Sequence, residues 1–223
     1  MIDNKLLKDA EKGDDKAQYE LGKIYDEGVV VSKDSEQAFI WYSKSAKQGN
    51  KKAQFCLGFI YGSKPFSKGI TTWNQDYEQA VYWFTKAAEQ GHTNAQVNLA
   101  STYFLIVKDY EQALYWNLKA AEQGDESAQY AVGKIYYEGM GVPKDYKAAL
   151  NWFVKSAEQG EIDSQYAIAS MYVYGIGVDK SLKNAAYWIN QVRNNTDKKY
   201  HKDYPTKHSA AKLWNENELW KYE

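Results

Sequence analysis

The side chains in this sequence that are best suited to metal binding are its three histidines. His201 and His208 lie seven residues apart, with no cysteine nearby and no histidine four residues away, and this spacing is not a zinc-binding pattern. His92 stands at a predicted helix start, where the equivalent positions hold Asn50 and Asp125, so capping of that helix explains it. The sequence therefore predicts no metal site.

Nucleophilic or phosphate-binding chemistry is not predicted either. A reactive thiol needs a lowered pKa and an orienting base, and the sequence places neither beside Cys56, which we interpret as a half-buried packing residue. Glycines 139 and 141 are not followed by the G-K-[ST] of a phosphate loop, and they recur as repeat turns. The neighbouring carboxylates Asp14 and Asp15 fall at a helix start, where the helix dipole favours them. We expect no catalytic residue and no cofactor.

Charge and composition narrow the classes of partner. The 28 basic and 29 acidic residues give a net charge of −1, which supplies no long-range attraction to nucleic acid or to an anionic membrane. Arg193 is the one arginine, and one cysteine excludes an intramolecular disulfide. The first ten residues carry two aspartates and two lysines without an apolar core, and no stretch approaches the roughly 18 apolar residues of a membrane helix. We predict a cytoplasmic protein that binds neither nucleic acid nor membrane.

An internal repeat is the strongest pattern in the chain. Five tryptophans recur at spacings of 42, 33, 36 and 36 residues: Trp41, Trp83, Trp116, Trp152 and Trp188. A second marker, the pair A-Q (S-Q in the last copy), recurs at spacings of 36, 42, 33 and 36, starting at Ala17, Ala53, Ala95, Ala128 and Ser164. The two series place the 42-residue spacing in different intervals, which locates an inserted loop at residues 62–75.

Each repeat is predicted to be a pair of helices. In the first helix Ala17, Leu21, Gly22 and Tyr25 share one face, and this face recurs in every copy. Seven residues before each tryptophan stands a helix-capping residue: Asp34, Asp76, Asp109, Asp145 and Ser181. Eight residues after the first four tryptophans stand glycines suited to a helix end: Gly49, Gly91, Gly124 and Gly160. We predict an all-α protein in which the five tryptophans form the core and fit into notches left by alanine and glycine.

The motifs A-Q-x-x-L-G-x-x-Y, E-G-x-G-V-x-x-D, A-x-x-W and A-x-Q-G, clearest at residues 128–160, resemble Sel-1-like repeats, which are relatives of tetratricopeptide repeats. The resemblance covers about residues 14–195 and implies an α-solenoid, a right-handed superhelix of antiparallel helix pairs. The implied division is a lead-in helix at 1–13, repeats at 14–49, 50–91, 92–124, 125–160 and 161–195, and a capping extension at 196–223.

The same resemblance implies a non-enzymatic protein-binding module: a bacterial adaptor or an immunity protein that neutralises a toxin. The repeats do not choose between these two roles. A cysteine-rich branch is associated with penicillin binding, but this chain lacks its cysteines, so a β-lactam-binding or β-lactam-hydrolysing protein is a disfavoured alternative. A structural homo-oligomer is the other alternative.

Candidate partner-binding residues follow from the analogy with tetratricopeptide repeats, in which the first helices line a concave groove. The groove positions would be Tyr19, Lys23, Asp26, Phe55, Phe59, Ser101, Phe104, Tyr130, Lys134, Tyr137, Tyr166, Ser170 and Tyr174. Rings mixed with isolated charges are typical of protein-binding surfaces, although some of these rings could instead pack between repeats. In the inserted loop, Phe66 and Trp73 either fold back against the repeat or contact a partner.

The tail, residues 196–223, follows a charged linker and a turn at Pro205. Residues 209–220 are predicted to form a helix with Ala210, Leu213, Trp214 and Trp220 on one side. We favour a cap on the last repeat, with a partner-binding arm as the alternative.

Overall fold

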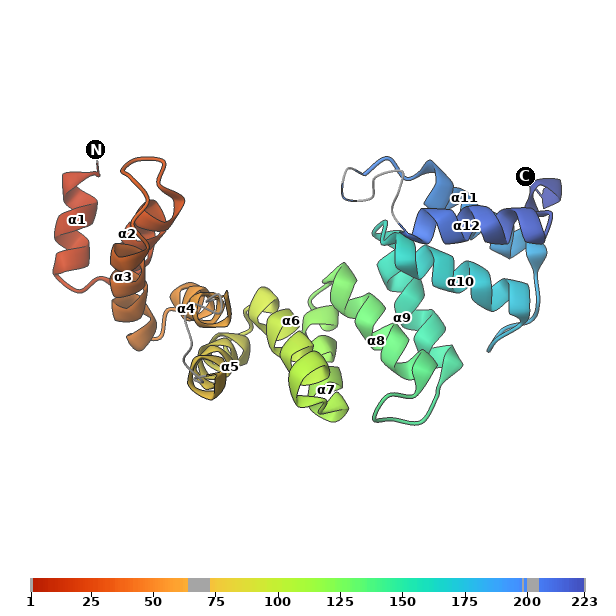
Figure 1. Cartoon of the computed structure of the whole chain (residues 1–223), viewed down its shortest axis with the longest axis horizontal. Helices are drawn as coiled ribbons and strands as arrows, with labels where there is room; N and C mark the ends of the chain where they lie inside the picture. The colour runs from red at the N-terminus through yellow and green to blue at the C-terminus, as the bar shows by residue number, and fades with distance from the viewer. Residues whose placement is uncertain (1, 64–72, 198, 200–204, 223) are drawn as a thin grey trace. The chain divides into compact units, whose positions relative to one another are not determined.

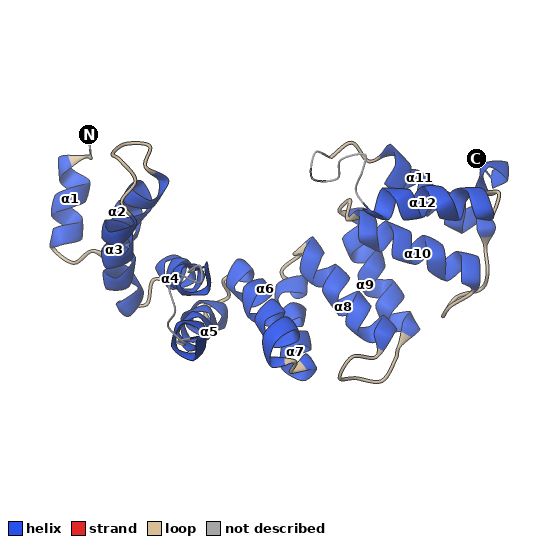
Figure 2. Cartoon of the chain, viewed as in Figure 1, coloured by secondary structure: helices blue, strands red, loops and turns tan. Residues whose placement is uncertain are grey.

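The protein is described here by a computed structural model that covers residues 2–63, 73–197, 199 and 205–222. These residues form helices and no strand (Figure 2). The helices are α1 (Asn4–Glu11), α2 (Asp15–Glu27), α3 (Ser35–Lys47), α4 (Lys51–Ser63), α5 (Trp73–Glu89), α6 (Thr93–Thr102), α7 (Tyr110–Glu122), α8 (Glu126–Glu138), α9 (Tyr146–Glu158), α10 (Ile162–Tyr174), α11 (Leu182–Asn194) and α12 (Pro205–Glu216). A π-helical turn, η1 (Tyr103–Val107), follows α6, and a 3-10 turn, η2 (Leu219–Tyr222), is the last described element.

The helices form sequential pairs, and the chain divides into two compact units (Figure 1). Unit 1 is Met1–Val107 and unit 2 is Lys108–Glu223. We call α2, α4, α6, α8 and α10 the A helices and α3, α5, α7, α9 and α11 the B helices. One A helix and the next B helix make one repeat, so the architecture is the predicted all-α solenoid of five repeats.

Most B helices begin where the capping residues predict. Asp109 accepts a hydrogen bond from the backbone N–H of Gln112 (3.0 Å), and Asp145 accepts one from Ala148 (2.9 Å). Asp34 and Ser181 cap α3 and α11 in the same way. The prediction for Asp76 was wrong, because α5 begins at Trp73, three residues earlier. No proline or glycine lies between Trp73 and Asp76 to stop the helix there.

The predicted glycine ends of the B helices are confirmed. Gly49, Gly91, Gly124 and Gly160 have φ of +96°, +74°, +94° and +95°. A residue with a Cβ is strained in this left-handed region, which explains why glycine recurs there.

The notches between paired helices do not hold the tryptophans, which corrects the sequence prediction. A Cβ placed on Gly22 would lie 2.7 Å from Cδ1 of Tyr42, and one placed on Gly133 would lie 2.6 Å from Cδ1 of Phe153. These rings belong to the residue that follows the repeat tryptophan. In the fifth repeat the notch residue is Ala169 and its partner is the smaller Ile189. In these repeats glycine therefore stands where a ring must fit, and alanine where the partner is the smaller isoleucine.

Two of the tryptophans instead lie at joints between successive repeats. Trp83 of the second repeat packs against a cluster that contains Ala46 and Leu57, and Trp188 packs against a cluster that contains Ala157. Trp41 and Trp116 are buried, whereas the other three are only half-buried. The prediction that all five are core residues therefore holds fully for two of them.

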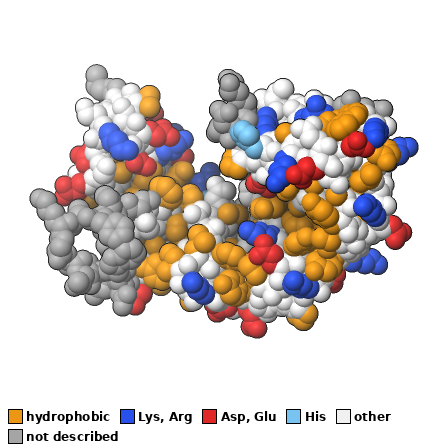
Figure 3. All heavy atoms as spheres, turned by 45° about the vertical axis from the view of Figure 1, so that its right-hand side comes forward, with side chains coloured by type: hydrophobic (Ala, Val, Ile, Leu, Met, Phe, Trp, Pro, Cys, Tyr) orange, Lys and Arg blue, Asp and Glu red, His pale blue; other side chains and the backbone are white. Residues whose placement is uncertain are grey.

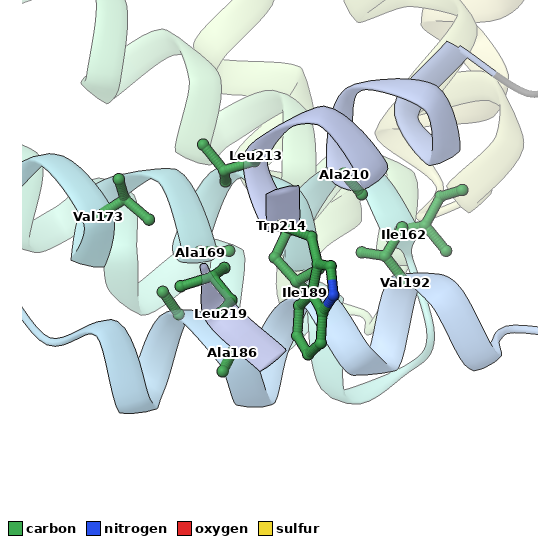
Figure 4. Packing of buried hydrophobic residues seen from close by; sticks show 11 residues of the cluster. Ile162, Ala169, Val173, Ala186, Ile189, Val192, Ala210, Leu213, Trp214 and Leu219 are labelled. Atoms are coloured by element: carbon green, nitrogen blue, oxygen red, sulfur yellow. The ribbon is translucent and has the colours of Figure 1, made fainter. Parts of the chain in front are cut away.

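The tail packs on the last repeat. α12 begins at Pro205, four residues before the predicted start, and Ala210, Leu213 and Trp214 are buried against α10 and α11 (Figure 4). Leu219 of η2 completes this cluster. Trp220, predicted on the same side, is exposed because η2 turns the chain after Glu216.

Candidate protein-binding site

The candidate groove positions lie on the A helices and at their ends, and they divide between the two units. Seven belong to unit 1 (Tyr19, Lys23, Asp26, Phe55, Phe59, Ser101 and Phe104) and six belong to unit 2 (Tyr130, Lys134, Tyr137, Tyr166, Ser170 and Tyr174). The prediction that the two sets line one continuous groove stays a prediction.

Several of these rings are held inside the repeats. Tyr19 packs on Tyr42, and Tyr130 packs on Phe153, each with 5.9 Å between ring centroids. Phe55 makes the same contact with Phe84. These half-buried side chains both support the helix pair and offer one edge to solvent.

Two rings among the candidates are largely exposed. Phe59 in the middle of α4 is 55% exposed, and Tyr174 at the end of α10 is 63% exposed. Figure 3 shows exposed hydrophobic side chains on unit 2, with charged side chains around them. Exposed rings beside charges are the composition expected of a protein-binding surface.

The charged candidates make only weak local ion pairs. Lys23 lies 3.6 Å from Glu27, and Lys134 lies 3.8 Å from Glu138, each pair one turn apart on an exposed helix face. Such pairs contribute about 0.3–0.5 kcal/mol, so both lysines can exchange them for a partner's carboxylate. Asp26 lies 3.5 Å from Lys33.

The remaining candidates lie in mixed surroundings. Tyr137 packs edge-on against Tyr146 with 5.3 Å between centroids, and Tyr166 packs against the buried cluster under the tail. Ser170 is half-buried, with no hydrogen-bond partner for its Oγ among the described residues. Phe104 lies in η1, and Ser101 is exposed at the end of α6.

Of the two candidates in the inserted loop, Phe66 falls outside the described residues. Trp73 is the first residue of α5 and not a loop residue.

His92 and Cys56 have structural roles in their repeats. His92 caps α6, since its Nδ1 accepts a hydrogen bond from the backbone N–H of Ala95 (3.3 Å), as predicted. Its ring stacks on Phe55, and burial together with the ammonium of Lys51 lowers the pKa of the imidazole. The described residues contain no group of three or more histidine, cysteine, aspartate or glutamate side chains placed to hold a metal.

Cys56 is half-buried, as the sequence predicts, and its thiol is chemically quiet. Burial raises the pKa of this thiol to about 11, although a side-chain hydrogen bond with Tyr42 lowers it. With this raised pKa the thiol is almost entirely protonated near neutral pH. Because the thiolate is the reactive form, the side chain is a poor nucleophile there.

We expect Cys56 in the folded protein to react with iodoacetamide far more slowly at pH 8 than the same thiol in urea. The rate should rise about tenfold for each pH unit up to about pH 11, because the thiolate fraction rises in that way below its pKa. Mass spectrometry of the alkylated protein against time measures both rates. Equal rates in the folded and unfolded protein at pH 8 would contradict the buried environment.

Sequence reasoning missed a set of exposed rings on the B helices. Tyr82, Tyr115 and Tyr187 each precede a repeat tryptophan and pack edge-on against it, with 4.9, 4.9 and 5.2 Å between centroids. The signal was present, because tyrosine stands before the tryptophan in three of the five copies.

A chain of buried amides links the repeats. The glutamine of each A-Q or S-Q pair donates a hydrogen bond from Nε2 to a backbone carbonyl of the preceding helix. The acceptor is the last alanine of the preceding B helix or, in the first repeat, Ala10 of α1. In the fourth repeat, for example, Gln129 donates to Ala121 over 3.1 Å. Its Oε1 then accepts from Nε2 of a glutamine at the end of its own repeat, as between Gln129 and Gln159 (2.8 Å). The same bond joins the equivalent glutamines of the first and second repeats. Because these bonds are buried, they fix how the A helix of a repeat is aligned along its own B helix and along the preceding B helix.

The profile of the Sel1 repeat matches the chain five times, at residues 15–50, 66–92, 93–125, 126–161 and 162–191. The chain belongs to the Sel1 repeat family. These five matches correspond to the five helix pairs, so the family resemblance read from the sequence is confirmed.

Solved Sel1 repeat structures share the fold. A protective antigen of uropathogenic Escherichia coli strains, which has the Sel1-like repeat fold, is 34% identical with a TM-score of 0.73, covering 96% of this chain and 46% of the antigen. This chain therefore spans less than half the length of that antigen. A Sel1 repeat protein of Oxalobacter formigenes is also 34% identical, with a TM-score of 0.76, covering 86% of this chain and 78% of that one.

An immunity protein of Pseudomonas aeruginosa is 22% identical, with a TM-score of 0.44 and coverage of 96% and 72%, and a similarity this low carries no functional argument. Comparison with curated proteins gives no match. None of the described helices combines the length and the apolar composition that a membrane span requires.

Proposed function

We propose that this Sel1 repeat protein is a non-enzymatic binding module that holds another protein along its A helices, in the cytoplasm of a bacterium. One observation supports this function above the others. The position six residues after the start of each A-Q pair holds Lys23, Phe59, Ser101, Lys134 and Ser170, and it is exposed in the first four repeats. The repeat presents this position to solvent without fixing its residue type, which leaves it available for recognition.

The physical basis of binding would be preorganisation. Buried amide bonds and the ring-in-notch contacts fix the backbone under these side chains, so little ordering entropy opposes association. An exposed ring such as Phe59 or Tyr174 would then serve as an anchor, and Lys23 and Lys134 would add charged contacts.

The partner is proposed to be a protein, and two roles remain as alternatives. An immunity protein would bind one toxin very tightly, whereas an adaptor would bind several partners more weakly. Both follow from the family resemblance, and the two relatives that are 34% identical come from bacteria.

Affinity capture from the native host, followed by measurement of the dissociation constant for each captured protein, tests the proposed surface. Phe59→Ala and Tyr174→Ala are each expected to weaken binding at least about fivefold, because a buried aromatic anchor contributes more than about 1 kcal/mol. Tyr82→Ala and Tyr115→Ala are matched controls: rings of similar exposure on B helices, expected to leave binding unchanged.

The reverse pattern, with loss at the B-helix tyrosines and none at Phe59 and Tyr174, would move the binding surface and overturn the A-helix proposal. Turnover of a chromogenic β-lactam, abolished by an A-helix substitution, would overturn the non-enzymatic role. A stable homo-oligomer that buries Phe59 or Tyr174 would favour the structural alternative.

A further inference from the structure

A cavity of about 380 Å³ opens in unit 2, at the joint between the fourth and fifth repeats. Its walls come from the end of α9, the start of α10 and the second half of α11. The residues that matter for its chemistry are Glu158, Gln165, Tyr187, Trp188, Gln191 and Asn195.

The chain of buried amides is broken at this cavity. Gln165 is 5% exposed and donates from Nε2 to the carbonyl of Ala157 over 3.1 Å, as its equivalents do. Its Oε1, however, is buried and has no hydrogen-bond partner among the described residues. Asn195 stands where Gln159 stands one repeat earlier, but it is one methylene shorter and donates to the carbonyl of Gly160 instead (3.3 Å). A buried acceptor without a donor is costly, so a ligand that supplies an N–H is favoured here.

The lysine that follows the repeat tryptophan is also missing at this joint, where Lys207 Nζ instead donates to the backbone carbonyl of Asn195 over 2.7 Å. Three residues after the tryptophan, the first four repeats have a lysine whose ammonium lies over a ring of the same helix. Lys44 lies 4.0 Å from the centroid of Trp41, and Lys155 lies 4.1 Å from that of Trp152. In the second and third repeats the lysine lies over the exposed tyrosine, at 5.9 and 5.7 Å. The fifth repeat has the neutral Gln191 at this position, so Tyr187 and Trp188 lack that cation.

The charge at the cavity mouth matches a cation. Glu158 is exposed at the end of α9 and makes no ion pair with a described residue. Arg193, the nearest cation along α11, lies over the ring of Trp214 at 4.2 Å. A carboxylate and two aromatic rings thus border a cavity whose wall includes Gln165, and together they favour a positively charged N–H donor.

We propose that this cavity binds the side chain of a lysine or arginine of a partner protein. Its ammonium or guanidinium group donates to Gln165 Oε1 and lies against Trp188 and Tyr187, with Glu158 balancing its charge. The partner thereby supplies the two contacts that earlier repeats make with their own glutamine and lysine. None of the A-helix candidate positions borders the cavity, so this site does not depend on the proposed groove.

Nuclear magnetic resonance of the ¹⁵N-labelled full chain can test the proposal with small probes. We expect N-acetyl-lysine amide and N-acetyl-arginine amide to shift the Trp188 indole N–H and the Gln165 side-chain amide saturably. N-acetyl-citrulline amide, a neutral analogue of the arginine probe, should bind at least about fivefold more weakly, because it lacks the cation–π and charge contacts.

Two substitutions that restore the residues of earlier repeats give the decisive comparison. Gln191→Lys should place the protein's own ammonium group over the rings of Tyr187 and Trp188. In Asn195→Gln, the side-chain amide of the new glutamine should donate a hydrogen bond to Gln165 Oε1. Each is expected to weaken the arginine probe at least about fivefold without unfolding the chain. Asn184→Lys, which adds the same charge two turns away on α11, should leave probe binding unchanged.

Three results would overturn the proposal: no saturable shift of Trp188 or Gln165, equal binding of the citrulline probe, or undiminished binding in Gln191→Lys. Free arginine binding more tightly than its blocked form would assign the cavity to a small molecule and would also overturn it. None of these results bears on Phe59 and Tyr174, so the proposed function is tested separately.

Discussion

Replacing Trp214 by alanine is expected to lower the free energy of unfolding of unit 2 by about 3–5 kcal/mol. Trp214 is 6% exposed and lies in the cluster that joins α12 to α10 and α11, beside Ile189 and Leu213 (Figure 4). The substitution removes the whole indole, and it also removes the ring under Arg193. Urea denaturation followed by circular dichroism measures the change.

Trp220 provides the matched control for this substitution. It lies six residues later in the same tail but is 46% exposed, so Trp220→Ala should change the free energy of unfolding by no more than about 0.5 kcal/mol. Equal losses for the two substitutions would contradict the packing of the tail on the last repeat.

Gly133→Ala is expected to destabilise the fourth repeat by about 1–3 kcal/mol, even though alanine forms helix better than glycine. The new Cβ would lie 2.6 Å from Cδ1 of Phe153, a ring that is itself buried in the core and has little room to move. Thermal or urea unfolding of the single substitution measures the loss.

A second substitution separates this collision from other effects. Adding Phe153→Ile should recover part of the loss, because it recreates the alanine–isoleucine pair of Ala169 and Ile189. Gly62→Ala is the control, since its Cβ would meet nothing closer than 3.8 Å, and it should stabilise α4 by about 0.5–1 kcal/mol. Additive losses in the double variant would show that ring and glycine are not coupled.

The sequence predicted the fold well because its signals are local and repeated. Capping by Asp145 and the helix end at Gly160 depend on residues within a few positions of each other, and five copies remove the ambiguity of one. The predicted start of α5 at Asp76 failed because the spacing was taken from repeats without an insertion.

Which side chain fills which notch was harder to predict. Trp152 and Phe153 are neighbours in sequence, and both are large rings, so spacing alone does not say which one meets Gly133. The signal that went unused was the match between the notch residue on the A helix and the residue after the tryptophan on the B helix. That notch residue is glycine opposite Tyr42 and Phe153, and it is alanine opposite Ile189.

The binding surface was predicted only as a set of positions. The sequence placed Phe59 and Tyr174 on the helices that now expose them, but it could not distinguish them from Tyr19 or Tyr130, whose rings pack inside their repeats. The cavity beside Gln165 could not be predicted from the sequence because its walls come from three helices, and the departures at residues 191 and 195 look conservative.

The pairing of each glycine with its ring also limits how such a gene can recombine. Joining the A helix of the fourth repeat to the B helix of the fifth would set Gly133 against Ile189 and leave a void. The reciprocal product would press Ala169 into Phe153. Crossovers between whole repeats keep each pair together, whereas crossovers inside a repeat separate them, so duplicated units should survive when they are copied from the start of one A helix to the start of the next.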